Sequence, residues 1–255
     1  MVDTIYEVEA SDVDLSSFKV REELNQDFWN GETLRRGVRH RLLDISDDFI
    51  DTLETPWVKV KDVVFTGSLA NYNWSRYSDI DLHIVINFKD VWEKRTDFVK
   101  DYFDAKKNEW AAEHDNIKIY GFPVEISVED EGEPSKSTGV YSLKSDKWMK
   151  KPKDLSDSRI NHEYVKETSA KFMTEIDNII KKVKKAKSPS EKWKTAEGLL
   201  KIFDKLKKLR KSGLESKAKE MSSGNIIWKT MRREGYINDI WDTVNSAYDM
   251  SVSLK

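Results

Sequence analysis

Residues 63–86 read VVFTGSLANYNWSRYSDIDLHIVI, and this stretch decides the fold. An apolar run at 63–65 stops at Thr66-Gly67-Ser68, which is the pattern of a buried strand that enters a tight turn. Residues 69–78 are polar and aromatic and predict a loop with room for one helical turn. Residues 79–86 alternate polar and apolar side chains at first and are then apolar on both faces. They predict a second strand.

Helical and strand patterns surround this stretch on both sides. Apolar residues recur every three or four positions from Leu34 to Leu53, and Pro56 ends that pattern. A second helical pattern covers 90–113. A hairpin is expected over 117–128, with its turn at 121–123, and residues 129–138 have the composition of a loop. A short strand at 140–143 then leads into a basic connector that ends near residue 155.

Beyond the connector the sequence predicts only helices, over 160–187, 191–211, 225–233 and 237–248, with Ser212-Gly213 ending the second. The resulting class is α+β, a mixed sheet with flanking helices followed by a C-terminal helical bundle. We therefore expect a catalytic domain over 32–150 and a helical domain over 151–255. Residues 1–31 form an N-terminal arm whose structure the sequence does not predict.

Composition limits the kind of protein. The chain has 255 residues and no cysteine, which excludes disulfides and thiolate metal sites. It begins without a secretory signal and has no run of about 18 apolar residues, so we expect a cytoplasmic protein that does not enter a membrane. Residues 1–140 hold 17 Lys and Arg against 30 Asp and Glu, whereas residues 141–255 hold 27 against 16. Either the acidic half holds metal and the basic half holds phosphate, or both halves have solvated charged faces.

Three features along residues 67–125 point to chemistry. Gly67 lets the backbone approach a ligand closely, and Ser68 adds a hydroxyl and an N–H, so the pair can cradle a phosphate or simply form a turn. Asp79 and Asp81 lie two residues apart on a predicted strand, so both carboxylates share one face. A divalent cation with a preference for hard oxygen ligands, Mg²⁺ or Mn²⁺, would relieve their repulsion. The alternative is a strand end that dips into solvent.

Glu125 is a lone acid within the apolar strand pattern of 124–128. If this strand pairs beside the strand of Asp79, Glu125 can complete a site of three carboxylates. The alternative is an edge strand with a polar outer face.

Together these residues resemble the DNA polymerase beta-like nucleotidyltransferase superfamily. The resemblance rests on Phe65-Thr66-Gly67-Ser68, Ser78-Asp79-Ile80-Asp81-Leu82 and Val124-Glu125-Ile126, and it covers roughly residues 60–130. It implies that Asp79, Asp81 and Glu125 are catalytic and bind two Mg²⁺ or Mn²⁺ ions, with Glu125 helping to deprotonate the attacking hydroxyl. It also implies that Gly67 and Ser68 bind the triphosphate of an NTP such as ATP.

Other polar and aromatic residues are weaker candidates. Arg76 is the best of the loop residues that can touch phosphates, and Asn71, Ser75 and Ser78 are the others. The alternative is that these residues only shape the loop. His83 can support the site or be a core histidine. Tyr141 and Trp148 can stack on a base or pack in the core.

The function that follows is transfer of a nucleoside monophosphate from an NTP to an acceptor hydroxyl, without a template and with release of pyrophosphate. The acceptor can be RNA bound by the basic C-terminal helices, although such lysine runs are also common as solvated faces. One alternative is a synthase of nucleotide second messengers that uses the same site. Another is a non-catalytic module that binds nucleic acid or a partner, as an antitoxin does. The sequence does not indicate the oligomeric state.

Overall fold

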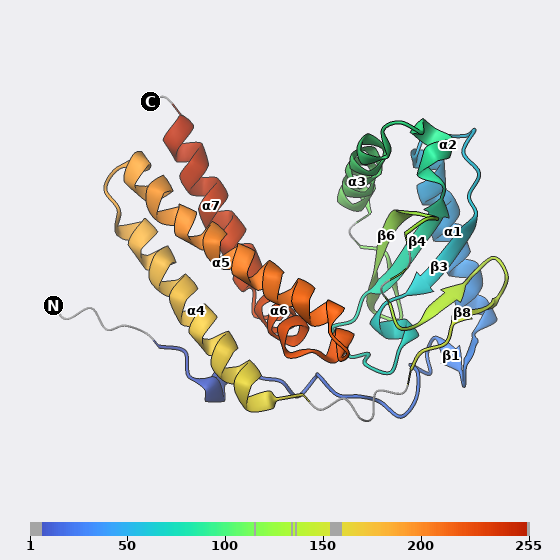
Figure 1. Cartoon of the computed structure of the whole chain (residues 1–255), viewed down its shortest axis with the longest axis horizontal. Helices are drawn as coiled ribbons and strands as arrows, with labels where there is room; N and C mark the ends of the chain where they lie inside the picture. Colours follow the sequence, from blue (N-terminus) through green and yellow to red (C-terminus); the bar gives the residue numbers. More distant parts are fainter. Residues whose placement is uncertain (1–6, 115, 134, 136, 154–159, 254–255) are drawn as a thin grey trace. The chain divides into compact units, whose positions relative to one another are not determined.

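The computed structural model describes residues 7–114, 116–133, 135, 137–153 and 160–253. The chain divides into two compact units (Figure 1). The sheet unit is Lys19–Asp157, and the helical unit is Met1–Phe18 together with Ser158–Lys255.

The sheet unit is built on a six-stranded sheet whose strand order is β5-β6-β4-β3-β7-β8. Only β4 and β6 pair in parallel, and the other neighbours are antiparallel. Its strands are β3 (Asp62–Thr66), β4 (Ile80–Ile86), β5 (Lys118–Ile119), β6 (Phe122–Asp130), β7 (Val140–Ser142) and β8 (Lys147–Lys150). The mixed sheet and the α+β class predicted from the sequence are confirmed.

Alternation along β4 separates the core from the site. Ile80, Leu82 and Ile84 are buried, whereas Asp81 and His83 between them are half-buried. Because successive side chains of a strand point to opposite faces, one face of β4 packs in the core and the other carries the polar residues. This alternation is the physical basis of the predicted strand.

Helices α1 (Arg36–Thr52), α2 (Phe88–Trp92) and α3 (Thr96–Glu113) complete the sheet unit. The rings of Phe49 in α1 and Trp110 in α3 lie 5.7 Å apart, and both side chains join the core of the sheet. The single helix expected over 90–113 is wrong, because the chain turns between α2 and α3. Phe88 and Phe103 pack with ring centroids 5.7 Å apart. A continuous helix would separate them by roughly 22 Å at 1.5 Å per residue.

Strand β8 lies where the sequence predicted a basic connector. Trp148 stacks on Trp29, with ring centroids 4.7 Å apart, while Lys147 and Met149 on either side of it are exposed. Since the anchor is a tryptophan more than 100 positions away, the local run of lysines conceals the strand.

The N-terminal residues divide between the two units. Leu24, Phe28 and Trp29 are buried in the core of the sheet unit, beside a small hairpin of β1 (Trp29–Asn30) and β2 (Thr33–Leu34). Residues 7–18 pack on the helical unit through Val13 and Leu15, and they include the short 3-10 helix η1 (Ala10–Asp12).

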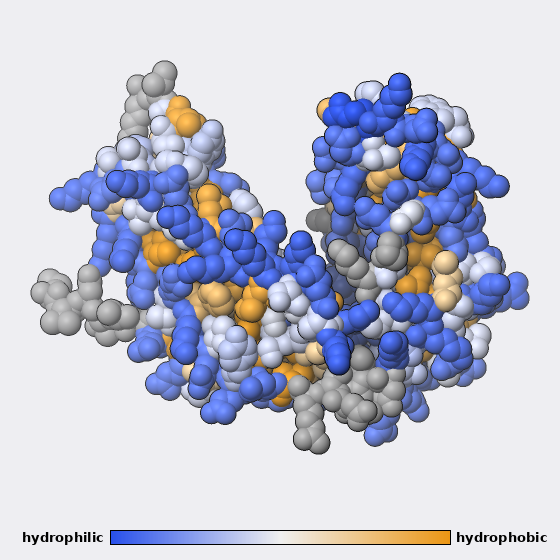
Figure 2. Space-filling view, viewed as in Figure 1, coloured by the Kyte–Doolittle hydropathy of each residue, from blue (hydrophilic) through white to orange (hydrophobic). Residues whose placement is uncertain are grey.

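The helical unit confirms the predicted C-terminal bundle. Its helices are α4 (His162–Lys185), α5 (Pro189–Glu215), α6 (Ser223–Arg233) and α7 (Tyr236–Val252), with a short 3-10 helix, η3 (Lys219–Met221). Helix α5 continues past Ser212-Gly213, contrary to the prediction, and Gly213 packs close to Ser222, which caps α6. In the visible face of Figure 2, hydrophilic residues cover most of this unit. None of the described helices is long and apolar enough to cross a membrane.

Candidate active site

Three carboxylates from neighbouring strands converge at one edge of the sheet. Asp81 on β4 is in register with Glu125 on the parallel strand β6, and Asp79 directly precedes β4. Each of the three residues offers an oxygen, and these oxygens all lie within 4.8 Å of one another. Asp79 and Asp81 are half-buried, whereas Glu125 is exposed. The sequence left open whether the strand of Glu125 pairs beside that of Asp79 or is an edge strand with a polar outer face. The strand β6 pairs with β4, and this pairing brings all three acids together.

A lysine that sequence reasoning missed lies beside this cluster. The Nζ atom of Lys107 on α3 is 2.7 Å from Oε1 of Glu125. A cation in this position offsets part of the repulsion among three close carboxylates. No local motif marks Lys107, which reaches the site only because α3 packs beside β6.

Gly67 is required by the close approach of Asp81. Thr66 is in register with Asp81 on the antiparallel pair β3–β4, so the next residue passes directly beside the carboxylate. A Cβ atom on Gly67 would lie 1.6 Å from Oδ2 of Asp81. Gly67 also has φ 74° and ψ −164°, a backbone region that residues other than glycine rarely adopt. Both features demand glycine at this position.

Serine hydroxyls tie the turn to the start of β4. Ser68, in the 3-10 helix η2 (Ser68–Ala70), donates to Oγ of Ser78 at 2.7 Å, and the same oxygen accepts from the N–H of Ser75 at 3.0 Å. All three serines are buried. They therefore hold the loop over 68–78 in a fixed form, which places Asp79 beside the turn.

Asn71 is fully buried and holds the turn from its other side. Its Nδ2 donates to the carbonyl oxygen of Gly67 at 2.6 Å, and its Oδ1 accepts from the hydroxyl of Thr138 at 2.6 Å. Gly139 fits against Asn71 because a Cβ there would lie 2.1 Å from the carbonyl oxygen of Ala70. Of the two alternatives for Asn71, the structure favours shaping the loop over touching phosphates, since its carboxamide is hydrogen-bonded inside the protein.

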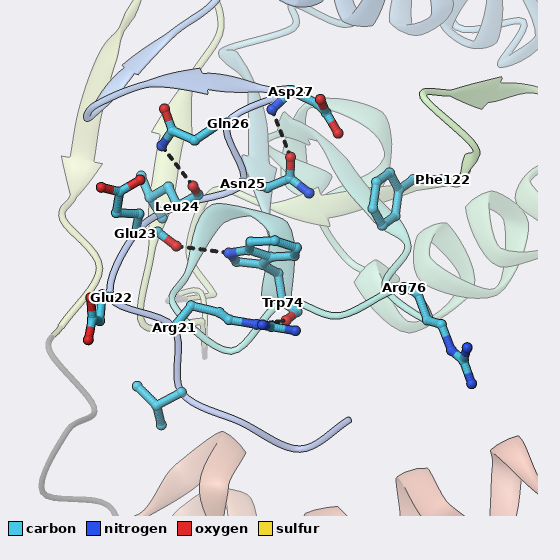
Figure 3. Close-up of a pocket in the computed structure, with 11 residues that line it drawn as sticks. Arg21, Glu22, Glu23, Leu24, Asn25, Gln26, Asp27, Trp74, Arg76 and Phe122 are labelled. Atoms are coloured by element: carbon cyan, nitrogen blue, oxygen red, sulfur yellow. Dashed lines mark hydrogen bonds between the residues drawn. The ribbon is translucent and has the colours of Figure 1, made fainter. Parts of the chain in front are cut away.

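Arg76 is exposed on the same loop. Its guanidinium lies 4.7 Å from the ring centroid of Tyr77 and bonds the hydroxyl of that tyrosine at 2.5 Å. Arg76 also lines a pocket of about 720 Å³ that is formed mainly by residues 20–27 (Figure 3).

The remaining candidates are His83, Tyr141 and Trp148. His83 lies against the carboxylate of Glu129 on β6. Tyr141 is buried, and its hydroxyl donates to Asp146 at 2.9 Å. Burial, followed by the contact with Asp146, raises the pKa of Tyr141 to about 12. Since Tyr141 and Trp148 both pack on Trp29, the base-stacking alternative for these two residues is wrong and the core alternative is confirmed.

The comparison with protein families agrees with this geometry. Residues 46–160 match the family model of the nucleotidyltransferase domain, a segment that contains all the residues of the carboxylate cluster and the turn. No curated protein matches the chain. Among solved structures, the chain is similar to a STING-associated CdnE c-di-GMP synthase from Capnocytophaga granulosa. That similarity covers 85% of this chain and 82% of that chain, at 12% identity and a TM-score of 0.23, and it supports no inference about substrate.

Proposed function

Residues 46–160 belong to the nucleotidyltransferase superfamily and the chain is a nucleotidyltransferase, and from this premise we propose that it adds a nucleoside monophosphate to an acceptor hydroxyl without a template. The donor is an NTP, and pyrophosphate is the leaving group. The acceptor is an RNA end.

The observation that carries the proposal is the cluster of Asp79, Asp81 and Glu125. Their oxygens lie within 4.8 Å of one another at the edge of a sheet, next to a turn that only glycine can form. Three acids this close are costly unless positive charge accompanies them. An in-line displacement at phosphorus is catalysed by positioning and charge neutralisation, which such a cluster can supply.

The donor set fits Mg²⁺ or Mn²⁺, because every ligand atom in it is a carboxylate oxygen. Asp79 and Asp81 would hold both ions, and Glu125 would hold the ion nearer the attacking hydroxyl. When bound, two such ions neutralise the acids and polarise the reacting phosphoryl group. Lys107, whose Nζ is 2.7 Å from Oε1 of Glu125, would hold that carboxylate in place for this role. The hydroxyl of Ser68 donates to Ser78, so Gly67 and Ser68 would meet the triphosphate through their backbone.

An RNA acceptor is supported by the lysines of the helical unit. The last turn of α4 carries Lys182, Lys184 and Lys185, all exposed, and α5 exposes Lys205, Lys207 and Lys208. Side chains of this kind bind the phosphate backbone of a nucleic acid without regard to sequence. Binding through them weakens as the salt concentration rises.

The test is transfer of label from each α-³²P NTP to total RNA in the presence of Mg²⁺ or Mn²⁺. Wild-type protein should label RNA, and Asp79→Ala/Asp81→Ala should not. Asp101→Ala/Asp104→Ala is the matched control, because it removes two exposed carboxylates from α3 and should leave the transfer rate unchanged.

Two results would change the proposal. Label in a small product without RNA would replace RNA by a nucleotide as the acceptor. Absence of transfer with every NTP, together with NTP binding that survives Asp79→Ala/Asp81→Ala, would indicate a binding module in place of an enzyme. A decline in RNA labelling with rising salt and with Lys184→Gln/Lys185→Gln would support the RNA acceptor.

A further inference from the structure

A pocket of about 720 Å³ opens beside the catalytic loop, entirely within the sheet unit. Residues 20–27 form one side of it, and Trp74, Arg76 and Phe122 form the other (Figure 3). This volume is in the range of sites for small organic ligands.

One polar group inside the pocket is held in a fixed orientation. Asn25 is buried, with 3% of its surface exposed. Its Oδ1 accepts a hydrogen bond from the N–H of Asp27 at 2.9 Å. This bond turns the amide nitrogen of Asn25 toward the space between Trp74 and Phe122 (Figure 3). Within the described part of the chain, that nitrogen donates to no other group. A ligand that offers an acceptor there would satisfy it.

Aromatic rings bound the same space. The indole of Trp74 is fixed by its Nε1, which donates to the carbonyl oxygen of Glu23 at 2.9 Å, and by Arg21, whose guanidinium lies 4.8 Å from the ring centroid. Phe122 is fixed by edge-on packing against Phe28, with centroids 5.6 Å apart. Rings held in this way favour a flat, aromatic ligand over a flexible one.

The charges of the pocket indicate which part of a ligand enters. Glu22, Glu23 and Asp27 are exposed acids along its lining, and they outnumber the one cation beside them, Arg21, whose guanidinium lies over the ring of Trp74, so a phosphate would be repelled there. Arg76, which extends away from Trp74 in Figure 3, is a cation at the boundary with the catalytic loop. A ligand with an uncharged ring inside and a phosphate near Arg76 matches this distribution.

The pocket lies at the end of the sheet where the parallel strands β4 and β6 begin. Phe122 is the first residue of β6 and Glu125 is the fourth, so their side chains point to opposite faces of the strand. Trp74 and Arg76 belong to the loop that leads into Asp79. This loop therefore links the pocket to the carboxylate cluster around the end of the two strands.

We propose that this pocket binds the nucleobase of a substrate, with the base between Trp74 and Phe122 and hydrogen-bonded to Asn25. The inference rests on the proposed function and extends it by naming the residues that select the base. The base belongs either to the incoming NTP or to the nucleotide at the acceptor end, and the two sources are separated by experiment.

Asn25→Asp is the informative variant. It keeps Oδ1 as the acceptor for the N–H of Asp27 and replaces the amide donor by an oxygen. Asn30→Asp is the matched control, since it makes the same amide-to-acid change on an exposed asparagine of β1 that does not line the pocket. The base-binding arm titrates each protein with AMP, GMP, CMP and UMP, without metal, by calorimetry.

Asn25→Asp should weaken the best-bound monophosphate by about tenfold to a hundredfold, because the donor that faces the base is lost, and Asn30→Asp should change it by less than threefold. Phe122→Leu, which keeps an apolar side chain, should weaken all four bases by about tenfold. If Asn25→Asp and Phe122→Leu both bind every monophosphate as wild type does, the pocket is not a base site.

Steady-state transfer separates the two sources. If the base is that of the NTP, Asn25→Asp changes the ranking of the four NTPs as donors. If it belongs to the acceptor, the ranking of NTPs is kept and the preferred terminal base of the RNA changes. If wild type transfers nucleotide and Asn25→Asp changes neither ranking, the base pocket is refuted and the proposed function is kept. Absence of transfer by wild type refutes the proposed function, and the monophosphate titration still tests the pocket.

Discussion

Replacing Gly67 with alanine should abolish most activity through a single displaced carboxylate. The added Cβ would lie 1.6 Å from Oδ2 and 2.6 Å from Cγ of Asp81, whereas non-bonded contacts are stable at about 3.5 Å. The carboxylate or the turn must therefore move by roughly 2 Å. A displacement of about 1 Å at a reacting centre can lower a rate a hundredfold. We expect a fall in the single-turnover rate of about a hundredfold or more, equivalent to about 2.7 kcal/mol.

The same substitution should also lower stability. Gly67 has φ 74° and ψ −164°, and an alanine in that region costs about 1–3 kcal/mol. Gly31→Ala is the matched control, because Gly31 also has a positive φ of 58° but no atom lies within 4 Å of its added Cβ. Thermal denaturation should therefore show a loss of stability in both variants.

Transfer rates and Mg²⁺ affinity distinguish the two effects. Gly31→Ala should transfer nucleotide at the wild-type rate at a temperature where it is folded, and Gly67→Ala should not. A Gly67→Ala protein with wild-type transfer and wild-type Mg²⁺ affinity would refute the argument that Asp81 depends on the missing side chain.

Three further predictions concern the metal, the lysine and pH. Mg²⁺ at about a hundred times its dissociation constant should raise the free energy of unfolding by about 2.7 kcal/mol, a rise that thermal denaturation should not detect in Asp79→Ala/Asp81→Ala. Lys107→Gln should lower kcat by about tenfold and Lys107→Arg should restore most of it. In Lys107→Gln the free energy of unfolding should change by less than about 1 kcal/mol, since the ion pair with Glu125 is part-exposed. A larger change in stability with kcat intact would contradict a positioning role for Lys107. Because the folded-state pKa of Tyr141 is raised from 10 to about 12, the free energy of unfolding should fall as the pH rises from 10 to 12. Melting temperatures measured against pH should show a smaller fall over this range in Tyr141→Phe than in wild type.

The parts of the fold that could be predicted are those whose cause is local. The alternation of β4 and the apolar run of β3 depend on neighbouring residues alone, so both strands and the turn between them could be read from the sequence. The helices of the bundle follow from apolar spacing of three and four in the same way. Their starts are marked by side-chain caps at Asn161, Ser188 and Ser222.

The parts that could not be predicted depend on contacts between distant residues. Strand β8 exists because Trp148 stacks on Trp29, and residues 19–31 are ordered because Leu24 and Phe28 complete the core of the sheet unit. Neither contact leaves a periodic signal in its own segment. Lys107 is a similar case at the site, since only the packing of α3 beside β6 brings its ammonium to Glu125.

Asn71 shows how a distant contact can define a catalytic turn. A polar residue in a loop next to a glycine and a serine suggests a ligand contact, yet both ends of its carboxamide are used inside the protein. One end holds the carbonyl oxygen of Gly67 and the other is held by Thr138, which lies 67 positions further along the chain. The conformation of Gly67 that admits Asp81 is thus secured from the segment before β7. A glycine-serine motif therefore needs this remote support before its turn can meet a carboxylate and a triphosphate together.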